Sequence, residues 1–504
     1  MRILPRTTGL PCWPPTALPP ALAPATNRLR DQLQGRIDPT GAVREPCHSR
    51  VLESALLLTL LDRVELEPAT RGRLAAYLSA HRDSSEPLDR LLARAALDGR
   101  PAPDDLLDIN LFLSAAPDFT GPRKRALLYA VLLLLGATPV TEFPAPEAFS
   151  LHGLHTWARV QVTAVKAILA HAHGKTATVE ERDVELLRST QRAATVWEGN
   201  LLIHLSVLHA LVPLPGLRGV VAEGVRTALE HQRADGGIPF ICDEDTWVTA
   251  TAGVALHAAG APAAVLDTIA RRLLDLQHPR GGWSFTEGAR LADVDCTSVA
   301  VEVLHLAGCD THRGPIHRAV TALHAMRGQD GGFPTYLAGA PSEACMTAAA
   351  ANALSTQGSA QHAAVTAALG HLASQQRPDG SFPPDWSSSR LHTVFRAALA
   401  AARHPSTPGV PGQRITRRAV RLVAKSQNAD GGWGQRAGDP SDALSTAYAL
   451  ITLSTQNTPG PAAQGVAYLL TQQRPDGSVA SIPDSIGPRP FRFTVPVLAD
   501  VFAL

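Results

Sequence analysis

Apolar residues recur at three- and four-residue spacing along most of the chain, with none of the regular alternation that marks β-strands. Segments such as 52–61, 123–134 and 445–453 are rich in Leu, Ala and Val, and breaks containing Pro or Gly separate them. Apolar positions at i, i+3, i+4 and i+7 form one face of an α-helix. The pattern therefore predicts an all-α protein.

Glycine-containing turns recur at a nearly constant spacing through the second half of the chain. Each is preceded by Gln, and an aromatic residue often follows. Their first glycines are separated by 45, 50, 49, 51 and 46 residues. A fixed period of this length indicates one supersecondary unit per repeat, here a pair of antiparallel helices. We expect six such units to close a ring, and an open helical solenoid is the alternative. The glycines are Gly236, Gly281, Gly331, Gly380, Gly431 and Gly477.

The same patterns divide the chain into three parts. Residues 1–26 are rich in Pro and lack the continuous apolar run of a signal peptide. Residues 27–185 keep a helical pattern without regular turns and predict a shorter N-terminal helical domain. Residues 186–504 contain the repeats and predict the ring.

Composition narrows the classes of function. The 46 Lys and Arg residues nearly balance 45 Asp and Glu, which argues against a nucleic-acid binder. The six cysteines have no paired metal spacing and indicate reduced thiols in a cytoplasmic protein. The longest apolar stretch, 126–137, is shorter than the roughly 20 residues that span a bilayer. A shallow contact with a membrane surface stays open as an alternative.

One repeat combines its turn with closely spaced carboxylates. Gly281-Gly282-Trp283 is followed by Asp293-Val294-Asp295-Cys296-Thr297. The turns resemble the QW motifs of squalene-hopene cyclases and related class II terpene cyclases, and the second segment resembles their Asp-x-Asp-Asp acid motif. The resemblance implies two α/α toroid domains of the βγ type. Residues 27–185 would be the γ-like domain and 186–504 a β-like (α/α)6 barrel.

The resemblance also implies a reaction, in which an acid protonates an alkene and starts ring closure. A carboxyl group keeps its proton at neutral pH only where burial raises its pKa. The family's pattern assigns the proton donor to Asp295 and a supporting role to Asp293, and places Cys296 and Thr297 beside the substrate. Cys296 stands where hopene cyclases have a second aspartate. Ala349 stands where they place a histidine that bonds the acid, so the proton relay must differ.

The substrate expectation combines composition with the resemblance. Aromatic residues make up only 5% of the chain, which favours few ring closures around stabilised cations. We expect a linear C15 or C20 prenyl diphosphate that keeps its diphosphate, acted on by a monomer or homodimer. Trp386, in a segment that weakly resembles one of bacterial diterpene cyclases, is a candidate contact for the substrate. Candidates for holding the diphosphate are Arg390, Arg489 and Arg492, or Mg²⁺ brought with the substrate; no resident metal is expected.

Other functions and other interpretations of the carboxylates stay open. A squalene-type triterpene cyclase, a non-enzymatic lipid-binding toroid and a zinc-binding protein prenyltransferase β-like subunit share the expected ring. An Asp-x-Asp segment at a helix start is also a common N-cap. Two further acidic segments, 104–108 and 243–245, are interpreted as a helix N-terminus and as a helix cap or an element at the rim of the substrate cavity.

Overall fold

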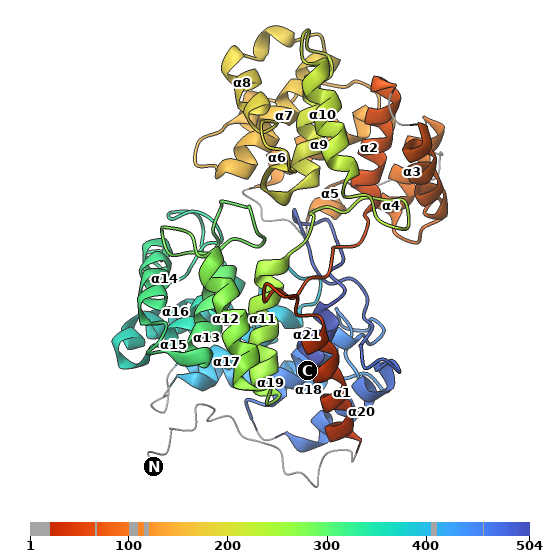
Figure 1. Cartoon of the computed structure of the whole chain (residues 1–504). Coiled ribbons are helices and arrows are strands. Elements are labelled where there is room, and N and C mark those ends of the chain that lie inside the picture. Colours follow the sequence, from red (N-terminus) through yellow and green to blue (C-terminus); the bar gives the residue numbers. More distant parts are fainter. Residues whose placement is uncertain (1–20, 66–67, 100–108, 115–119, 405–410, 457) are drawn as a thin grey trace. The chain divides into compact units, whose positions relative to one another are not determined.

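The computed structural model describes residues 21–65, 68–99, 109–114, 120–404, 411–456 and 458–504, and in these it is helical without strands (Figure 1). The acidic segment 104–108 and most of the Pro-rich start lie outside the described residues. Among the described helices, none has the length and apolar character needed to cross a bilayer. The all-α expectation is confirmed.

The chain forms two compact units. The N-terminal unit consists of Pro46–Asp243 and Gly487–Thr494, and the second consists of the residues up to Glu45, Glu244–Ile486 and Val495–Leu504. In the N-terminal unit, α9 is buried along its whole length and packs against α2, α7, α8 and α10. The helices are α2 (Val51–Val64), α3 (Pro68–Ala80), α4 (Pro87–Asp98), α5 (Ile109–Leu113), α6 (Gly121–Leu134), α7 (Thr156–Ala172), α8 (Glu181–Ser189), α9 (Leu201–Leu211) and α10 (Arg218–Leu229), with short 3-10 turns at Pro146–Phe149, Thr176–Thr178 and Trp197–Gly199.

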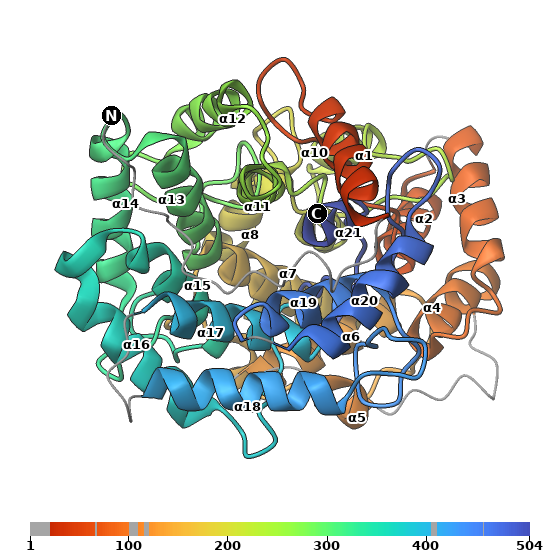
Figure 2. The same ribbon diagram turned by 90° about the horizontal axis from the view of Figure 1, so that it is seen from below.

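The second unit is a closed double ring of helices (Figure 2). Each inner helix contacts the next, and the last one returns to the first, which closes the circle. The inner helices are α11 (Asp245–Ala258), α13 (Val294–Gly308), α15 (Ala344–Ser355), α17 (Leu391–Arg403), α19 (Ala443–Leu453) and α21 (Leu498–Ala503). The outer helices are α12 (Ala263–Leu276), α14 (Arg313–Met326), α16 (His362–Gln375, preceded by a 3-10 turn at Gly358–Gln361), α18 (Pro411–Lys425), α20 (Pro459–Gln472) and α1 (Leu22–Gly35).

The ring is completed by a helix that the repeats do not include. Helix α1 packs against α11, α20 and α21 and so occupies the sixth outer position. The first repeat turn lies instead in the N-terminal unit, where a Cβ on Gly236 would be 2.5 Å from the carbonyl oxygen of Arg73 in α3. The chain therefore does not divide at the expected residue 185. Because one repeat turn, at Gly236, belongs to the N-terminal unit, the start of the repeats does not mark the boundary between the units.

The repeat turns fix outer helices to one another. At the turn after α12, Gln277 Nε2 donates to the carbonyl oxygens of Gly281 (3.0 Å) and Pro315 (2.9 Å). Gly281 has a φ of +95°, and a Cβ there would lie 2.4 Å from the carbonyl oxygen of Arg318 in α14. The indole of Trp283 donates to Leu273 O at 2.7 Å. The turn thus holds α12 against α14 and sets the place where the next inner helix begins.

Candidate active site

The first turn of α13 contains the carboxylates that the sequence singles out. Asp293 is the N-cap, and its Oδ1 accepts a hydrogen bond from the Cys296 N–H at 2.7 Å. The hydroxyl of Thr297 accepts from the backbone N–H of Trp283 at 3.1 Å. The Asp293 side chain therefore caps this helix, and the Thr297 side chain joins the helix to the repeat turn.

The same two contacts occur at another inner helix. At α19, Asp442 Oδ1 accepts from the Ser445 N–H at 2.8 Å. The Thr446 hydroxyl accepts from the Trp433 N–H at 3.0 Å. Asp293 and Thr297 thus occupy positions with a structural role in the repeat, and the N-cap interpretation of Asp293 holds.

Asp295 has no such structural role. The equivalent position, two residues after the N-cap, is Cys345 in α15 and Leu444 in α19. The side chain of Asp295 is 16% exposed, and its Oδ1 forms an ion pair with Arg396 Nη1 of α17 at 2.6 Å. Burial lowers the pKa of Arg396, but Asp295 outweighs this effect and the pKa stands above its usual value. The carboxyl group of Asp295 therefore lies at ion-pair distance from a cation that does not lose its proton.

Asp293 experiences a different electrostatic environment from Asp295. Its burial raises its pKa to about 7, although the hydrogen bonds from Cys296 act in the opposite direction, and the nearby charge of Asp295 adds to the increase. Burial also raises the pKa of the Cys296 thiol well above its usual range. One carboxyl of the pair can hold a proton near neutral pH, while the other faces a guanidinium.

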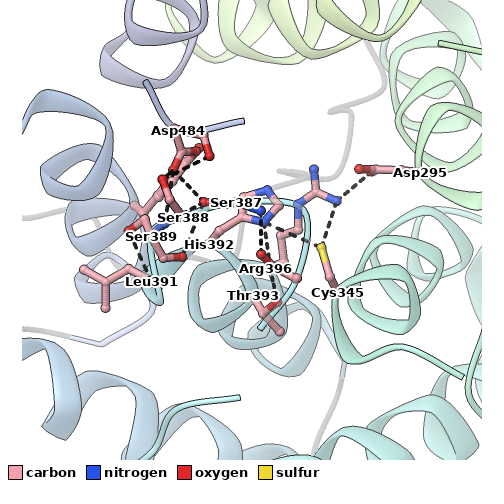
Figure 3. A network of polar contacts seen from close by, with 12 residues as sticks. Asp295, Cys345, Ser387, Ser388, Ser389, Leu391, His392, Thr393, Arg396 and Asp484 are labelled. Carbon is pink, nitrogen blue, oxygen red and sulfur yellow. Dashed lines mark hydrogen bonds and ion pairs between the residues drawn. The ribbon is translucent and has the colours of Figure 1, made fainter. Parts of the chain in front are cut away.

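A chain of polar contacts continues from Arg396 along the first turns of α15 and α17 (Figure 3). Arg396 Nη1 lies 3.7 Å from Cys345 Sγ, and this sulfur lies 3.6 Å from His392 Nδ1. The same Nδ1 is 3.0 Å from Asp385 Oδ2, which also accepts a hydrogen bond from the hydroxyl of Thr393. Sequence reasoning missed Arg396, Cys345 and His392 because they come from different repeats. Only the equivalence of Cys345 with Asp295 within the repeat could have indicated one of them.

The position at which hopene cyclases have a histidine is occupied by Ala349, and Asp295 contacts a different side chain. Ala349 lies buried in α15. The group that bonds Asp295 comes instead from α17, the next inner helix, and is Arg396. The side chain that contacts Asp295 is therefore a guanidinium rather than an imidazole.

The remaining predicted residues are divided between the two units. In the ring, Trp386 packs edge-on against Tyr336 with ring centroids 5.9 Å apart, and Arg390 is the N-cap residue of α17. Arg489 and Arg492 lie in the N-terminal unit, where Arg492 forms an ion pair with Glu86 at 3.3 Å.

Arg489 belongs to a group of basic side chains within the N-terminal unit. Burial lowers the pKa of Lys124 to about 7, and the positive charges of Arg489, Arg123 and Arg50 lower it further. Burial and the charges of Arg123 and Lys124 also lower the pKa of His155, to about 4. These cations lie close enough to disfavour one another's charge, an arrangement that a bound anion would relieve.

Comparisons with known proteins identify the family of this chain. Residues 337–494 match the squalene-hopene cyclase C-terminal domain family. The chain is 40% identical over 505 residues to a drimenyl diphosphate synthase of Streptantibioticus cattleyicolor, covering 95% of this chain and 93% of that protein. A drimenyl diphosphate synthase of Streptomyces showdoensis is 37% identical, with 96% and 94% covered.

A solved structure extends the similarity to the fold of the whole chain. The ent-copalyl diphosphate synthase of Streptomyces platensis superimposes with a TM-score of 0.58 at 20% identity, covering 96% of this chain and 98% of that one. The similarity in sequence to the two drimenyl diphosphate synthases spans nearly all of each protein. The chain therefore belongs to the class II terpene cyclases, in the family of the bacterial drimenyl diphosphate synthases.

Proposed function

We propose that this cyclase converts the linear C15 prenyl diphosphate, farnesyl diphosphate, into a bicyclic isomer that keeps its diphosphate. Both whole-length relatives are named for drimenyl diphosphate, which is a bicyclic C15 diphosphate. The low content of aromatic residues, 5% of the chain, also favours a short cascade. Of the two chain lengths expected from the sequence, C15 is therefore preferred over C20.

In this proposal Asp295 donates the proton. Asp293 and Thr297 are accounted for by the repeat, whereas the repeat places Cys345 or Leu444, and no carboxylate, at the positions equivalent to Asp295. This is the observation that carries the assignment. Arg396 stabilises the carboxylate that remains on Asp295 after its proton has left, at an ion-pair distance of 2.6 Å.

Asp293 supports the donor by holding a proton. Because burial raises its pKa to about 7, about half of this carboxyl is protonated at neutral pH, two residues from the donor. The proton adds to the terminal alkene of the substrate, two carbon–carbon bonds form in turn, and a proton is lost from a neighbouring carbon. The product has the same atoms as the substrate, so no oxidant or reductant is needed.

The diphosphate is assigned to the basic group of the N-terminal unit. Arg489, Lys124 and Arg123 offer charge that a diphosphate would neutralise, and Arg489 is itself buried. Arg390, in the ring, faces the charges of Asp379 and Asp439 and is a weaker candidate.

Mg²⁺ is proposed only as a companion of the diphosphate. Mg²⁺ prefers a shell of oxygen ligands. Among the described residues, the one group of three potential metal ligands contains a thiol and an imidazole, which do not suit Mg²⁺. We assign no resident Mg²⁺ site to this chain.

The proposal extends to where the enzyme works. A cytoplasmic monomer or homodimer that touches membranes peripherally suits a substrate with a long apolar chain. Sedimentation with liposomes and the molar mass in solution test these two points.

The experiment that tests the function offers purified protein C15 and C20 prenyl diphosphates and squalene in parallel. Products are treated with phosphatase and identified by mass spectrometry. The expected result is a bicyclic C15 alcohol from the first substrate and much slower turnover of the others. Preferred conversion of squalene would instead favour a triterpene cyclase, and no turnover of any substrate would favour a lipid-binding toroid.

A further inference from the structure

A second cluster of reactive side chains lies in the ring and has no part in the proposed proton transfer. Cys345 comes from the first turn of α15, His392 from the first turn of α17, and Asp385 from the segment before α17. All three are buried. The ligand atoms Sγ, Nδ1 and a carboxylate oxygen lie within 4.8 Å of one another.

The distances within this cluster match those around a tetrahedral metal ion. His392 Nδ1 lies 3.6 Å from Cys345 Sγ and 3.0 Å from Asp385 Oδ2. With zinc bond lengths of about 2.0–2.1 Å to nitrogen and oxygen and about 2.3 Å to sulfur, tetrahedral edges are roughly 3.6 Å for N···S and 3.3 Å for N···O. The two distances from His392 Nδ1 are thus within a few tenths of an ångström of these edges, and all three ligand atoms lie within 4.8 Å of one another.

We propose that Cys345, Asp385 and His392 form a binding site for a zinc-like transition metal ion. A thiolate and an imidazole select borderline and soft ions such as Zn²⁺ over Mg²⁺. Three protein ligands leave a fourth position open for water or another small ligand. This proposal departs from the expectation from the sequence that the chain has no resident metal.

The surroundings of the cluster orient its ligands. The Ser387 N–H donates to Asp385 Oδ1 at 2.8 Å, and the Thr393 hydroxyl donates to Oδ2. Such outer hydrogen bonds fix the direction of a carboxylate ligand. The side chain of His392 also packs against Tyr448, with ring centroids 5.4 Å apart.

Charge balance is compatible with a divalent ion. A thiolate on Cys345 and a carboxylate on Asp385 together neutralise two positive charges, and the nearby Arg396 is already paired with Asp295. Burial raises the pKa of the Cys345 thiol well above its usual range, although the charge of Arg396 opposes this effect. Without a metal the thiol therefore keeps its proton, and binding must release it.

Cobalt titration of the whole protein tests the site without measuring cyclisation. The chelator-treated protein is titrated with Co²⁺, and the thiolate-to-cobalt charge-transfer absorption in the near ultraviolet is followed. Saturation at one ion per chain, reversed by Zn²⁺, is the expected result. Cys345→Ser should abolish the band, and His392→Gln should weaken binding at least about 10-fold.

The matched control is Cys47→Ser, which alters a buried cysteine of the N-terminal unit and should leave the titration unchanged. Circular dichroism melts establish that each variant is folded. Two outcomes overturn the proposal: no charge-transfer band in the wild-type protein at millimolar Co²⁺, or an unchanged band in Cys345→Ser. In either case Asp385 and His392 form only a hydrogen-bonded pair, and the proposed cyclase activity is unaffected.

Discussion

At the scale of single residues, the first turn of α13 separates structural from chemical roles. Asp293 caps the helix as Asp442 does at α19, whereas Asp295 stands where other inner helices carry Cys345 or Leu444. In a repeat protein, equivalent positions of different repeats can be compared with one another. A side chain that recurs at these positions has a structural role. A side chain that departs from the repeat needs another explanation, and for Asp295 we propose acid catalysis.

The substitution Asp295→Asn is expected to lower product formation by about 10²–10⁴-fold, the range typical of general acids. The amide keeps the shape of the side chain but has no acidic proton. Asp293→Asn should reduce the rate less, because it removes a supporting carboxyl only. Asp442→Asn changes the equivalent N-cap and should leave turnover unchanged. Product yields by mass spectrometry, after a check that each variant melts like the wild type, measure these effects. Turnover at the wild-type rate by folded Asp295→Asn would remove the assignment.

The raised pKa of Asp293 predicts how stability changes with pH. Between about pH 4 and pH 7 the folded protein keeps a proton on this carboxyl that the unfolded chain has lost, so rising pH destabilises the fold in that window. The loss amounts to at most about 4 kcal/mol and levels off above pH 7. The Asp293→Asn variant has no titratable group at this position and should not show this loss of stability.

Denaturant unfolding of both proteins across pH 4–8 measures the effect. As the pH rises to 7, the free energy of unfolding of the wild-type protein should fall relative to that of the Asp293→Asn variant. A difference that stays constant over this range would show that the carboxyl of Asp293 is not held protonated by the fold.

At the scale of elements, the repeat turns stabilise the ring because their backbone packs closely against the backbone of the neighbouring outer helix. Gly281 needs both its positive φ and its missing side chain, since a Cβ would lie 2.4 Å from the Arg318 carbonyl oxygen. Gly288 has a φ of +83° but no atom within 4 Å of such a Cβ. Substitution of Gly288 therefore measures backbone strain alone, whereas substitution of Gly281 measures backbone strain together with steric contact.

Gly288→Ala is expected to cost about 1–2 kcal/mol of unfolding free energy, from strain in the left-handed region alone. Gly281→Ala should cost roughly 1–3 kcal/mol more, because α12 and α14 must move apart to admit the methyl group. Chemical denaturation of both variants measures the difference. Equal losses would mean that the turn tolerates the contact.

At the scale of the whole chain, the sequence predicts what is local and periodic. The spacing of the glycine turns and the helical periodicity predict an all-helical ring, and the ring is closed. Helix α1 was not predicted as part of it, because its place beside α11 and α20 depends on contacts about 200 residues or more apart in the chain. The ion-pair partner of Asp295 was not predicted for the same reason, because Arg396 is 101 residues away in the sequence.

If α1 is a full member of the ring, its core residues should contribute as much as those of other outer helices. Leu33 in α1 and Leu273 in α12 are both completely buried. Each Leu→Ala substitution is expected to cost about 2–5 kcal/mol. Thermal and denaturant unfolding compare the two variants directly. A wild-type melt for Leu33→Ala alongside a destabilised Leu273→Ala would exclude α1 from the stable core.

The closure of the ring by α1 and α21 also has a consequence for how the protein is made. Both compact units use residues from 487–504: the N-terminal unit needs Gly487–Thr494, and the ring needs α21. Neither unit can be complete on the ribosome until these residues have emerged from the exit tunnel. The surface of α1 that packs against α20 and α21 therefore stays uncovered until these two helices have been synthesised.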